Sequence, residues 1–312
     1  MKREKIRVFN ALYDQYKYFG LPVDLIDVHT NFTIFNLKDV FQERLPFRSP
    51  VNRLNFFVFV FTKNGAGRYI IDEQQFELVP GTIYFTNPGH LRSYQWTAVE
   101  EVYLITFTES FLKENVHADI FEAFPFLLAE TFPARVLRTD LFTEFEQLYL
   151  QILREYNGHS PYRTRIIVNL FVVLLLKIKE YFWLDYNPIY EGSRSSQIVK
   201  NFKRLLEKHY RDLGAGKVGR VFRVQEYADA QHLHPNYLSN VIRTKTGKSI
   251  GTWIAEKTIA EAKSLLQNST IPVKEIAYRL GFAESAHFSN YFRKHTDTSP
   301  AAYRKAHYGI SS

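Results

Sequence analysis

Near the C-terminal end of the sequence, side chains that could read DNA bases recur with the spacing of one helix face. Small, polar and cationic residues stand at i, i+3, i+4 and i+7, as Ala286, Ser289, Asn290 and Arg293. Phe288 and Phe292 fall on the opposite face, as in a helix that buries one side. In the major groove, asparagine can pair with two atoms of adenine, and arginine with two atoms of guanine.

A shorter apolar segment and a turn precede this stretch. Residues 275–280 carry Ile276, Ala277 and Leu280, and Gly281 then takes positive φ at no steric cost. Two helices with a glycine between them have the layout of a helix-turn-helix, whose second helix enters the major groove. Taken alone, an ordinary helical hairpin with a solvated polar face explains the pattern equally well.

A second copy of the pattern lies fifty positions upstream. Residues 238–243 (LSNVIR) correspond to 288–293 (FSNYFR), and 249–253 correspond to 299–303 at the same offset. Further upstream, 226–228 match 275–277 at an offset of 49, so the two turns differ by one residue. Such repetition indicates a duplicated structural unit. Apolar spacing over 249–266 predicts one long helix that connects the two units.

The outward-facing side chains of both units are the candidate DNA contacts. They are Asn236, Ser239, Asn240, Arg243 and Lys245 in the first unit, and Ser285, Ala286, Ser289, Asn290, Arg293, Lys294 and Arg304 in the second. We expect Lys245, Arg293, Lys294 and Arg304 to contact phosphates, which set affinity and salt dependence. Ala286 suits a thymine methyl group, whereas Arg243 suits a phosphate or a base equally. For any single cation, a solvated surface position is the alternative.

The last hundred or so residues resemble the DNA-binding domain of AraC/XylS-type transcription regulators. The resemblance rests on Gly281-Phe282, Phe288-Ser289, Phe292-Arg293-Lys294, Ser299-Pro300 and Tyr303-Arg304. It implies two helix-turn-helix units on one linker helix, binding double-stranded DNA. The first unit departs from the family pattern in its turn, where His232-Leu233-His234 stands without the usual glycine.

Composition and charge agree with a protein that binds a polyanion through one half. The chain has 312 residues, no cysteine and a net charge of +8. Residues 192–312 hold 20 Lys and Arg against 9 Asp and Glu, so that half carries +11 and the remainder −3.

Without cysteine, neither disulfides nor thiolate metal sites can form. The N-terminal residues lack the apolar run of a signal peptide, so we expect a cytoplasmic protein with no membrane contact.

Short β segments separated by Gly and Pro turns predict a small barrel or sandwich between residues 25 and 107. Strands are expected at 32–35, 54–61, 68–72, 74–78, 82–85 and 102–107, with a turn at 63–67. Residues 78–90 resemble the cupin-type barrel found at the front of many AraC/XylS regulators. This resemblance implies an effector site in the barrel, with His90, Tyr84 and Tyr69 as candidate ligand contacts. The aromatic side chains of these strands suit core packing equally well.

A metal-dependent cupin enzyme with an appended DNA-binding domain is the main alternative, and it lacks its ligands. Such enzymes need a His-x-His pair with further ligands, yet the N-terminal histidines are widely spaced. The pair His232 and His234 lies in the first helix-turn-helix turn, with no third ligand at a suitable spacing. We therefore predict no catalytic residue, metal or cofactor. A helical adaptor that binds acidic protein through its basic face is a third reading.

Residues 109–186 have a helical texture. The apolar run at 166–176 is too short to cross a bilayer and is followed at once by Lys177 and Lys179. The resemblance implies that the helices within 140–184 form a homodimer interface; a purely internal core is the alternative. RNA polymerase becomes a further partner if the protein is an activator.

We therefore predict a multidomain α+β protein. A cupin-like effector-binding and dimerisation domain spans 1–186, a linker 187–196, and an all-α DNA-binding domain 197–312.

Overall fold

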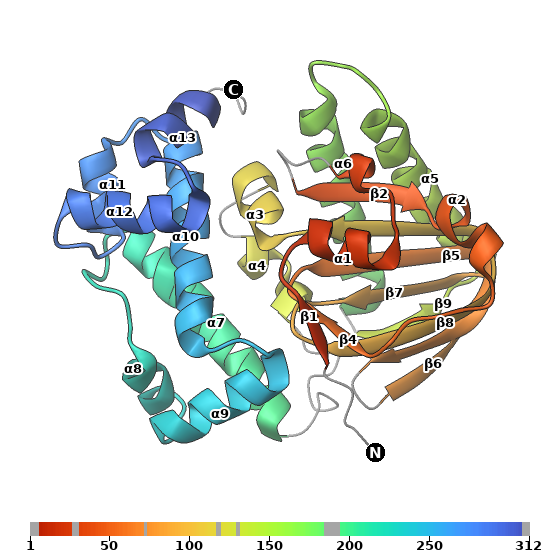
Figure 1. The fold of residues 1–312 in the computed structure, drawn as a ribbon, viewed down its shortest axis with the longest axis horizontal. Coiled ribbons are helices and arrows are strands. Elements are labelled where there is room, and N and C mark those ends of the chain that lie inside the picture. Colours follow the sequence, from red (N-terminus) through yellow and green to blue (C-terminus); the bar gives the residue numbers. More distant parts are fainter. Residues whose placement is uncertain are drawn as a thin grey trace. The chain divides into compact units, whose positions relative to one another are not determined.

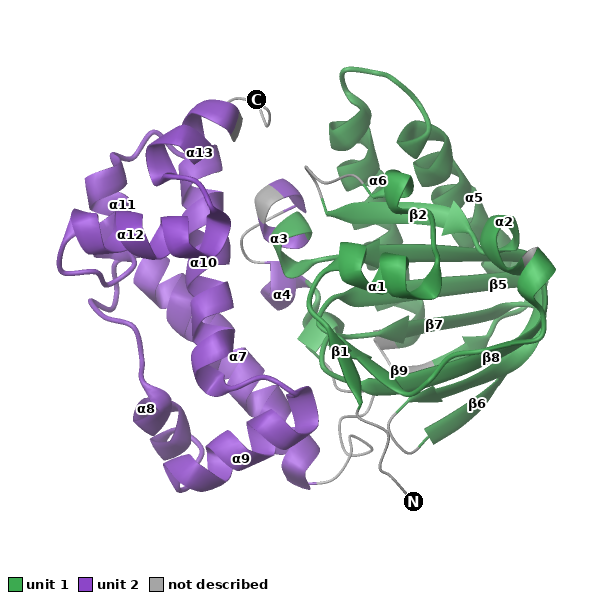
Figure 2. Ribbon diagram, in the orientation of Figure 1, with its two compact units in different colours: residues 1–111, 124–192 green, residues 112–123, 193–312 purple. Residues whose placement is uncertain are grey.

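The computed structural model describes residues 6–26, 31–71, 74–116, 120–128, 132–183 and 194–307. The chain forms two compact units (Figures 1 and 2). Unit 1 comprises residues 1–111 and 124–192, and unit 2 comprises residues 112–123 and 193–312. The predicted linker at 187–196 lies outside the described residues as far as 193, and 194–196 already belong to a helix.

Unit 1 is built on a nine-stranded sheet that curls round an apolar interior (Figure 1). Its strands are β1 (Arg7–Phe9), β2 (Phe32–Asn36), β3 (Phe47–Arg48), β4 (Asn52–Leu54), β5 (Phe57–Ile71), β6 (Gln74–Leu78), β7 (Thr82–Thr86), β8 (Leu91–Phe107) and β9 (Phe132–Val136). The main path runs β1-β4-β8-β5-β7-β9, with β2 and β3 also paired to β8, and β6 to β5. β1 and β4 are parallel, and the other pairs are antiparallel.

The turn predicted at 63–67 is wrong, because β5 continues through these residues as a single strand of 15 residues. Its pairing with β8 shifts register three times between Thr62 and Gly67, as β-bulges do. Gly67 is needed for close approach of the strands, since a Cβ there would clash with the carbonyl oxygen of Gln95. The glycines that indicated a turn in the sequence therefore serve a bulge.

The bulge changes which side chains of β5 face the interior. Before it, Val58 and Val60 belong to the interior cluster, and after it Tyr69 and Ile71 do. Alternation along a strand has a period of two, so an irregular step changes the parity of the inward positions.

The opposite face of the sheet packs on two helices of unit 1, α5 (Thr139–Tyr156) and α6 (Arg163–Ile178). The ring of Phe59 lies 6.0 Å from that of Phe171 on α6, and Phe61 lies 5.0 Å from Tyr149 on α5. Unit 1 also contains α1 (Leu12–Phe19), α2 (Lys38–Phe41) and α3 (Glu109–Phe111). The expectation of an all-helical texture over 109–186 missed β9, which is a strand because it pairs with β7.

Unit 2 is helical and has two apolar cores. Its helices are α4 (Ile120–Ala123), α7 (Arg194–Gly214), α8 (Val224–Asp229), α9 (Pro235–Thr246), α10 (Ile250–Asn268), α11 (Val273–Arg279), α12 (Ser285–Thr296) and α13 (Pro300–His307). One core gathers α7, α8, α9 and the start of α10; the other gathers the rest of α10 with α11, α12 and α13. The long helix expected over 249–266 is thus confirmed as α10, and it contributes to both cores.

The segment 112–123 packs within unit 2 through buried charges. Lys113 forms ion pairs with Glu207 of α7, at 3.3 Å, and with Glu261 of α10. Lys257 pairs with the same two carboxylates. The two lysine side chains are only 1% and 2% exposed, so two cations and two anions share one desolvated cluster.

In the part of the chain that the structure describes, no helix is long and apolar enough to cross a membrane.

Candidate DNA-binding surface

The two helix-turn-helix units repeat the same backbone hydrogen bonds 49 positions apart. After α8, the amide of Leu233 donates to the carbonyl of Ala228 at 2.9 Å; after α11, Phe282 donates to Ala277 at 3.0 Å. The residue directly before each donor lies in the left-handed region: His232 has φ 55° and Gly281 has φ 79°. The first unit therefore makes the same turn without a glycine.

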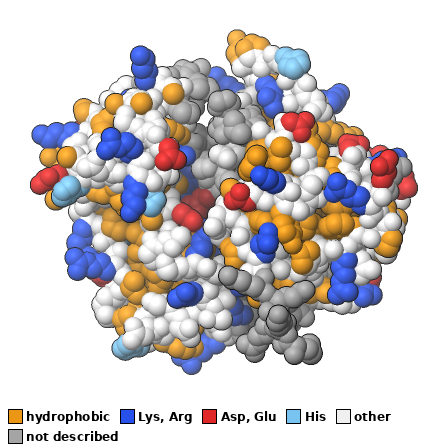
Figure 3. Space-filling model, viewed as in Figure 1, with side chains coloured by type: hydrophobic (Ala, Val, Ile, Leu, Met, Phe, Trp, Pro, Cys, Tyr) orange, Lys and Arg blue, Asp and Glu red, His pale blue; other side chains and the backbone are white. Residues whose placement is uncertain are grey.

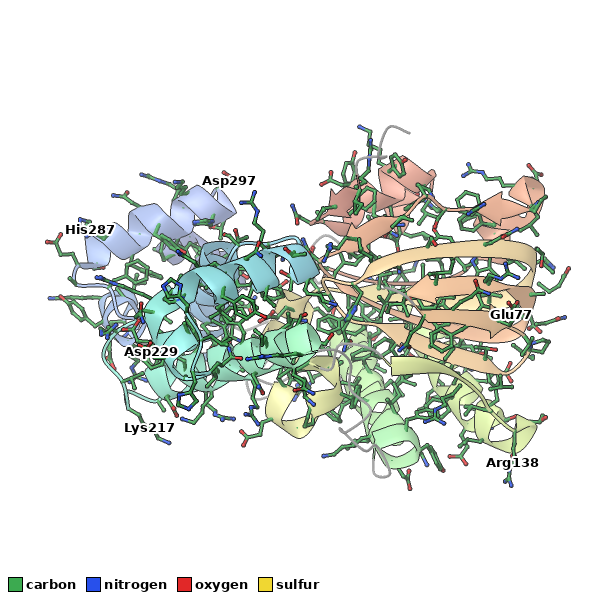
Figure 4. All side chains as sticks on the ribbon, turned by 90° about the horizontal axis from the view of Figure 1, so that it is seen from below. Glu77, Arg138, Lys217, Asp229, His287 and Asp297 are labelled. Atoms are coloured by element: carbon green, nitrogen blue, oxygen red, sulfur yellow. The ribbon has the colours of Figure 1, made fainter. Side chains whose placement is uncertain are left out.

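The second helix of each unit begins and ends in a defined way. α9 begins with Pro235 at its first position, and the Nδ1 atom of His234 accepts a hydrogen bond from the amide of Asn236 at 3.2 Å. Gly247 caps the C-terminus of α9 and Asp297 that of α12; the two residues are fifty positions apart and both are left-handed. Figure 4 shows His287 in the first turn of α12 and Asp297 at its end.

The inward faces of α9 and α12 are fully buried, as their spacing predicted. Leu238 and Ile242 on α9, and Phe288 and Phe292 on α12, all have 0% exposure. Each pair occupies corresponding positions in the two units, so both helices are anchored along the same stripe. This anchoring fixes which side of each helix faces solvent.

The residues predicted to contact DNA lie on the solvent side. Seven have exposed side chains: Asn236, Asn240, Arg243, Ala286, Asn290, Arg293 and Lys294. Five are half-buried: Ser239, Lys245, Ser285, Ser289 and Arg304. Figure 3 shows many Lys and Arg side chains on the visible face of unit 2.

Two of the predicted contacts have partners within the protein. The guanidinium of Arg293 donates to the Oδ1 atom of Asn290 at 3.1 Å, which turns the amide donors of Asn290 away from Arg293. Arg304 donates to the carbonyl of Ile271 at 2.6 Å and to that of Leu266 at 3.3 Å. Arg304 therefore satisfies carbonyls at and just beyond the end of α10, a structural role that the sequence did not indicate.

The candidate ligand residues of unit 1 lie inside or beside the barrel. Tyr69 and Tyr84 belong to the interior cluster, with ring centroids 4.2 Å apart. His90 is buried directly before β8. In the described ranges, no three side chains of the kinds that ligate metals come together.

Sequence reasoning missed two residues of this interior, Arg92 and Tyr94. Both lie on β8, on the same face as Trp96, which belongs to the interior cluster. Burial raises the pKa of the Tyr94 phenol to about 12, and the positive charge of Arg92 acts in the opposite direction. The alternation Arg92, Tyr94, Trp96 was the available signal, but 91–101 was not expected to be a strand.

Two family models match the chain, one in each unit. A model described as a helix-turn-helix domain matches residues 227–306, and one described as an AraC-like ligand binding domain matches residues 44–163.

Similar proteins bear related names. The HTH-type transcriptional activator RhaR of Salmonella schwarzengrund (strain CVM19633) is 25% identical over 251 residues, which cover 80% of this chain and 84% of that protein. The arabinose operon regulatory protein of Escherichia coli (strain K12) is 26% identical over 160 residues, 51% of each chain.

Among solved structures, the C-terminal domain of AraT, a response regulator from Geobacillus stearothermophilus, is 28% identical. It covers 37% of this chain and 90% of that domain, with a TM-score of 0.33, too low to establish the fold. The two family models match separate parts of the chain, and the relatives reported above are named as regulators of transcription or of an operon. The chain belongs to the AraC/XylS family of DNA-binding transcription regulators, with a ligand-binding domain in front of two helix-turn-helix units.

Proposed function

We propose that the chain places α9 and α12 in two successive stretches of major groove on one face of the DNA. The observation that carries this proposal is the duplication itself. Asn240 and Asn290 stand fifty positions apart at corresponding points of two helices, both exposed, each above a fully buried stripe. Helices of this kind read sites about one helical turn apart. Because α10 belongs to both cores, straight DNA would have to bend, at a cost of about 1–6 kcal/mol.

The individual contacts follow from side-chain chemistry. Asn236, Asn240 and Asn290 offer amides for adenine edges, and Ala286 offers a methyl group for thymine. Ser239, Ser285 and Ser289 are half-buried hydroxyls on the same stripes, suited to bases or backbone oxygens. Arg243, Lys245, Arg293 and Lys294 supply charge for phosphates. Arg304 already donates to the carbonyls of Leu266 and Ile271, so its phosphate contact would use its remaining N–H groups.

Unit 1 supplies regulation rather than catalysis. A small effector held by the barrel, among residues such as Tyr69, Tyr84 and His90, would change how the DNA-binding units of a dimer are presented. The outer face of α6 suits the dimer contact, because Val173 is 41% and Leu176 51% exposed. An activator of this architecture would contact RNA polymerase once bound.

The test is selection of duplexes by the full chain from a randomised pool at two salt concentrations. Three variants accompany the wild type: Asn240→Ala, Asn290→Ala, and Asn157→Ala as a matched control on an exposed asparagine of unit 1. We expect a motif of two blocks about one turn apart. Each helix variant should relax one block, costing about 1–3 kcal/mol of discrimination there, and the control should change neither.

Binding that falls steeply with salt, enriches no motif and ignores both variants would indicate only a basic helical surface. The proposed two-helix reading of DNA would then be withdrawn, and an acidic protein partner would become the better candidate.

A further inference from the structure

The interior of unit 1 contains a buried arginine. Arg92 is 4% exposed and lies on the inward face of β8, opposite Ile71 of β5 and Asn52 of β4. Ile71 belongs to the apolar interior cluster. Tyr94 and Trp96 follow Arg92 on the same face of the strand. A guanidinium group thus lies within a largely aromatic and aliphatic interior.

Arg92 has little to compensate its charge. Its Nε atom donates to the Oδ1 atom of Asn52 at 3.4 Å, and its Cζ atom lies 5.9 Å from the ring centre of Tyr94. Across the described residues, no carboxylate pairs with it and no further hydrogen bond engages its two Nη atoms. An arginine side chain keeps its positive charge inside a protein. A buried cation without an anion is strongly unfavourable.

Two phenol groups accompany this cation. Burial raises the pKa of Tyr84 and of Tyr94, while the charge of Arg92 lowers both, so the guanidinium is electrostatically coupled to each hydroxyl. In the described part of the chain neither hydroxyl has a hydrogen-bond partner, whereas the nearby Tyr69 hydroxyl bonds to Thr86. Register places Tyr94 opposite Tyr69, whose ring stacks on that of Tyr84, so one cation and two neutral donors share this interior, and the described residues supply them only the Asn52 oxygen as an acceptor.

We propose that Arg92, with the hydroxyls of Tyr84 and Tyr94, binds the carboxylate of a small organic acid, and that this acid is the effector. The planar fork of guanidinium donors matches two carboxylate oxygens, and the aromatic walls suit the organic part of the acid. An acid supplies the missing negative charge, whereas a neutral sugar or alcohol leaves the cation uncompensated. The effector role rests on the proposed regulator function; the binding site does not.

The first measurement is thermal unfolding of the full chain without ligand. If Arg92 stabilised the fold, Arg92→Met would lower the melting temperature. If Arg92 is instead an uncompensated charge that binds a ligand, as proposed, Arg92→Met should raise the melting temperature, because methionine is similar in volume and apolar. Arg68→Met is the matched control, since Arg68 is half exposed on β5 and paired with Glu77 at 3.0 Å.

The second measurement adds probes at constant ionic strength. Acetate, propionate, benzoate and phenylacetate are compared with their neutral amides and with inorganic phosphate, each up to about 50 mM. At about ten times its Kd, a bound acid should raise the melting temperature by about 3–6 °C, and its amide should not. The shift should vanish in Arg92→Met, shrink in Tyr84→Phe and Tyr94→Phe, and persist in Arg68→Met.

The proposal is overturned if ligand-free Arg92→Met has a lower melting temperature than the wild type, or if an acid and its amide shift the melting temperature equally. It is also overturned if phosphate shifts the melting temperature, or if none of the probes does. None of these measurements involves DNA. If the acids fail while the full chain still selects a two-block motif, only this inference is lost. If the motif fails while the Arg92-dependent shift is present, the acid site stands and the proposed reading of DNA is lost.

Discussion

At the scale of single residues, the two turns of the DNA-binding units solve the same geometry with different side chains. Gly281 adopts φ 79° at no intrinsic cost, and a Cβ there would lie 3.0 Å from the amide nitrogen of Val221. His232 adopts φ 55° with its Cβ in place. A non-glycine residue in this region costs about 1 kcal/mol per position.

Opposite effects of substitution are therefore expected at the two turns. His232→Gly should raise the free energy of unfolding by about 0.5–1 kcal/mol, because it removes the left-handed penalty. Gly281→Ala should lower it by about 1–3 kcal/mol, through both φ and the close backbone. Denaturant titration measures both, with Gly251→Ala, near the start of α10 and free of close contacts, as control. Destabilisation by His232→Gly would mean that its imidazole holds the turn.

At the scale of elements, the sequence predicted what is locally encoded. The helices α9, α10 and α12 were predictable because a helix that buries one stripe repeats its apolar residues every three to four positions. β9 and the continuous β5 were not predictable in this way. Their residues become strands through partners distant in the sequence, and Gly65 and Gly67 carry the same local signal in a bulge as in a turn.

The candidate sites differ for the same reason. The stripe through Asn240 and Asn290 follows from helical periodicity, so its exposure could be expected. Arg92 became visible only once β8 was known to extend back to Leu91, which fixes that side chain on the inward face. The bonds of Arg304 depend on α13 packing on α10, which no local pattern indicates.

The packing of α7 should depend on pH through His209. Its Nε2 atom accepts a hydrogen bond from the amide of Phe222 at 3.0 Å, and the two rings stack at 3.7 Å. Burial, assisted by the charge of Arg220, lowers the pKa of His209 below its usual 6.5, although Asp212 and Glu226 act against this. The unfolded chain therefore binds the proton first as pH falls.

Stability should accordingly be complete above about pH 6.5 and should decline as pH falls from there towards the folded-state pKa. His209→Gln should flatten this decline. The measurement is the free energy of unfolding between pH 5 and 8, with His295→Gln, on an exposed histidine of α12, as control. An unchanged slope in His209→Gln would exclude this histidine as the source.

The buried charge cluster around Lys113 gives a second prediction at this scale. Lys113→Ala removes one of the two buried lysines that pair with Glu207 and Glu261, which should lower the free energy of unfolding by about 3 kcal/mol. Lys208→Ala removes an exposed pair with Asp212, formed at 2.7 Å, and should cost less than about 0.5 kcal/mol. Chemical denaturation of both variants checks the difference. Similar small losses would show that the cluster is solvated.

At the scale of the whole molecule, positive charge and exposed apolar surface lie in different parts of the chain. The basic excess lies in residues 192–312, whereas exposed apolar side chains of a long helix lie on α6. We therefore expect a polyanion to bind unit 2 and a second copy of the chain to bind unit 1.

The dimer prediction is specific to that helix. Leu176→Glu should raise the dimer dissociation constant at least about tenfold, because it places a carboxylate in an apolar contact. Val51→Glu, at a residue 50% exposed outside α6, is the control. Light scattering after size exclusion measures the mass. A wild-type monomer at micromolar concentration, or a Leu176→Glu dimer, would contradict the assignment.

The bulge in β5 has a consequence for how this protein can vary. Val58 and Val60 before it and Tyr69 and Ile71 after it face the same interior only because the irregular steps between them change the parity. Deleting one residue between 62 and 67 would turn Tyr69 and Ile71 outward while leaving the rest of the strand unaltered. Length changes in this stretch should therefore be tolerated in steps of two, and an odd change should remove Tyr69 and Ile71 from the barrel interior.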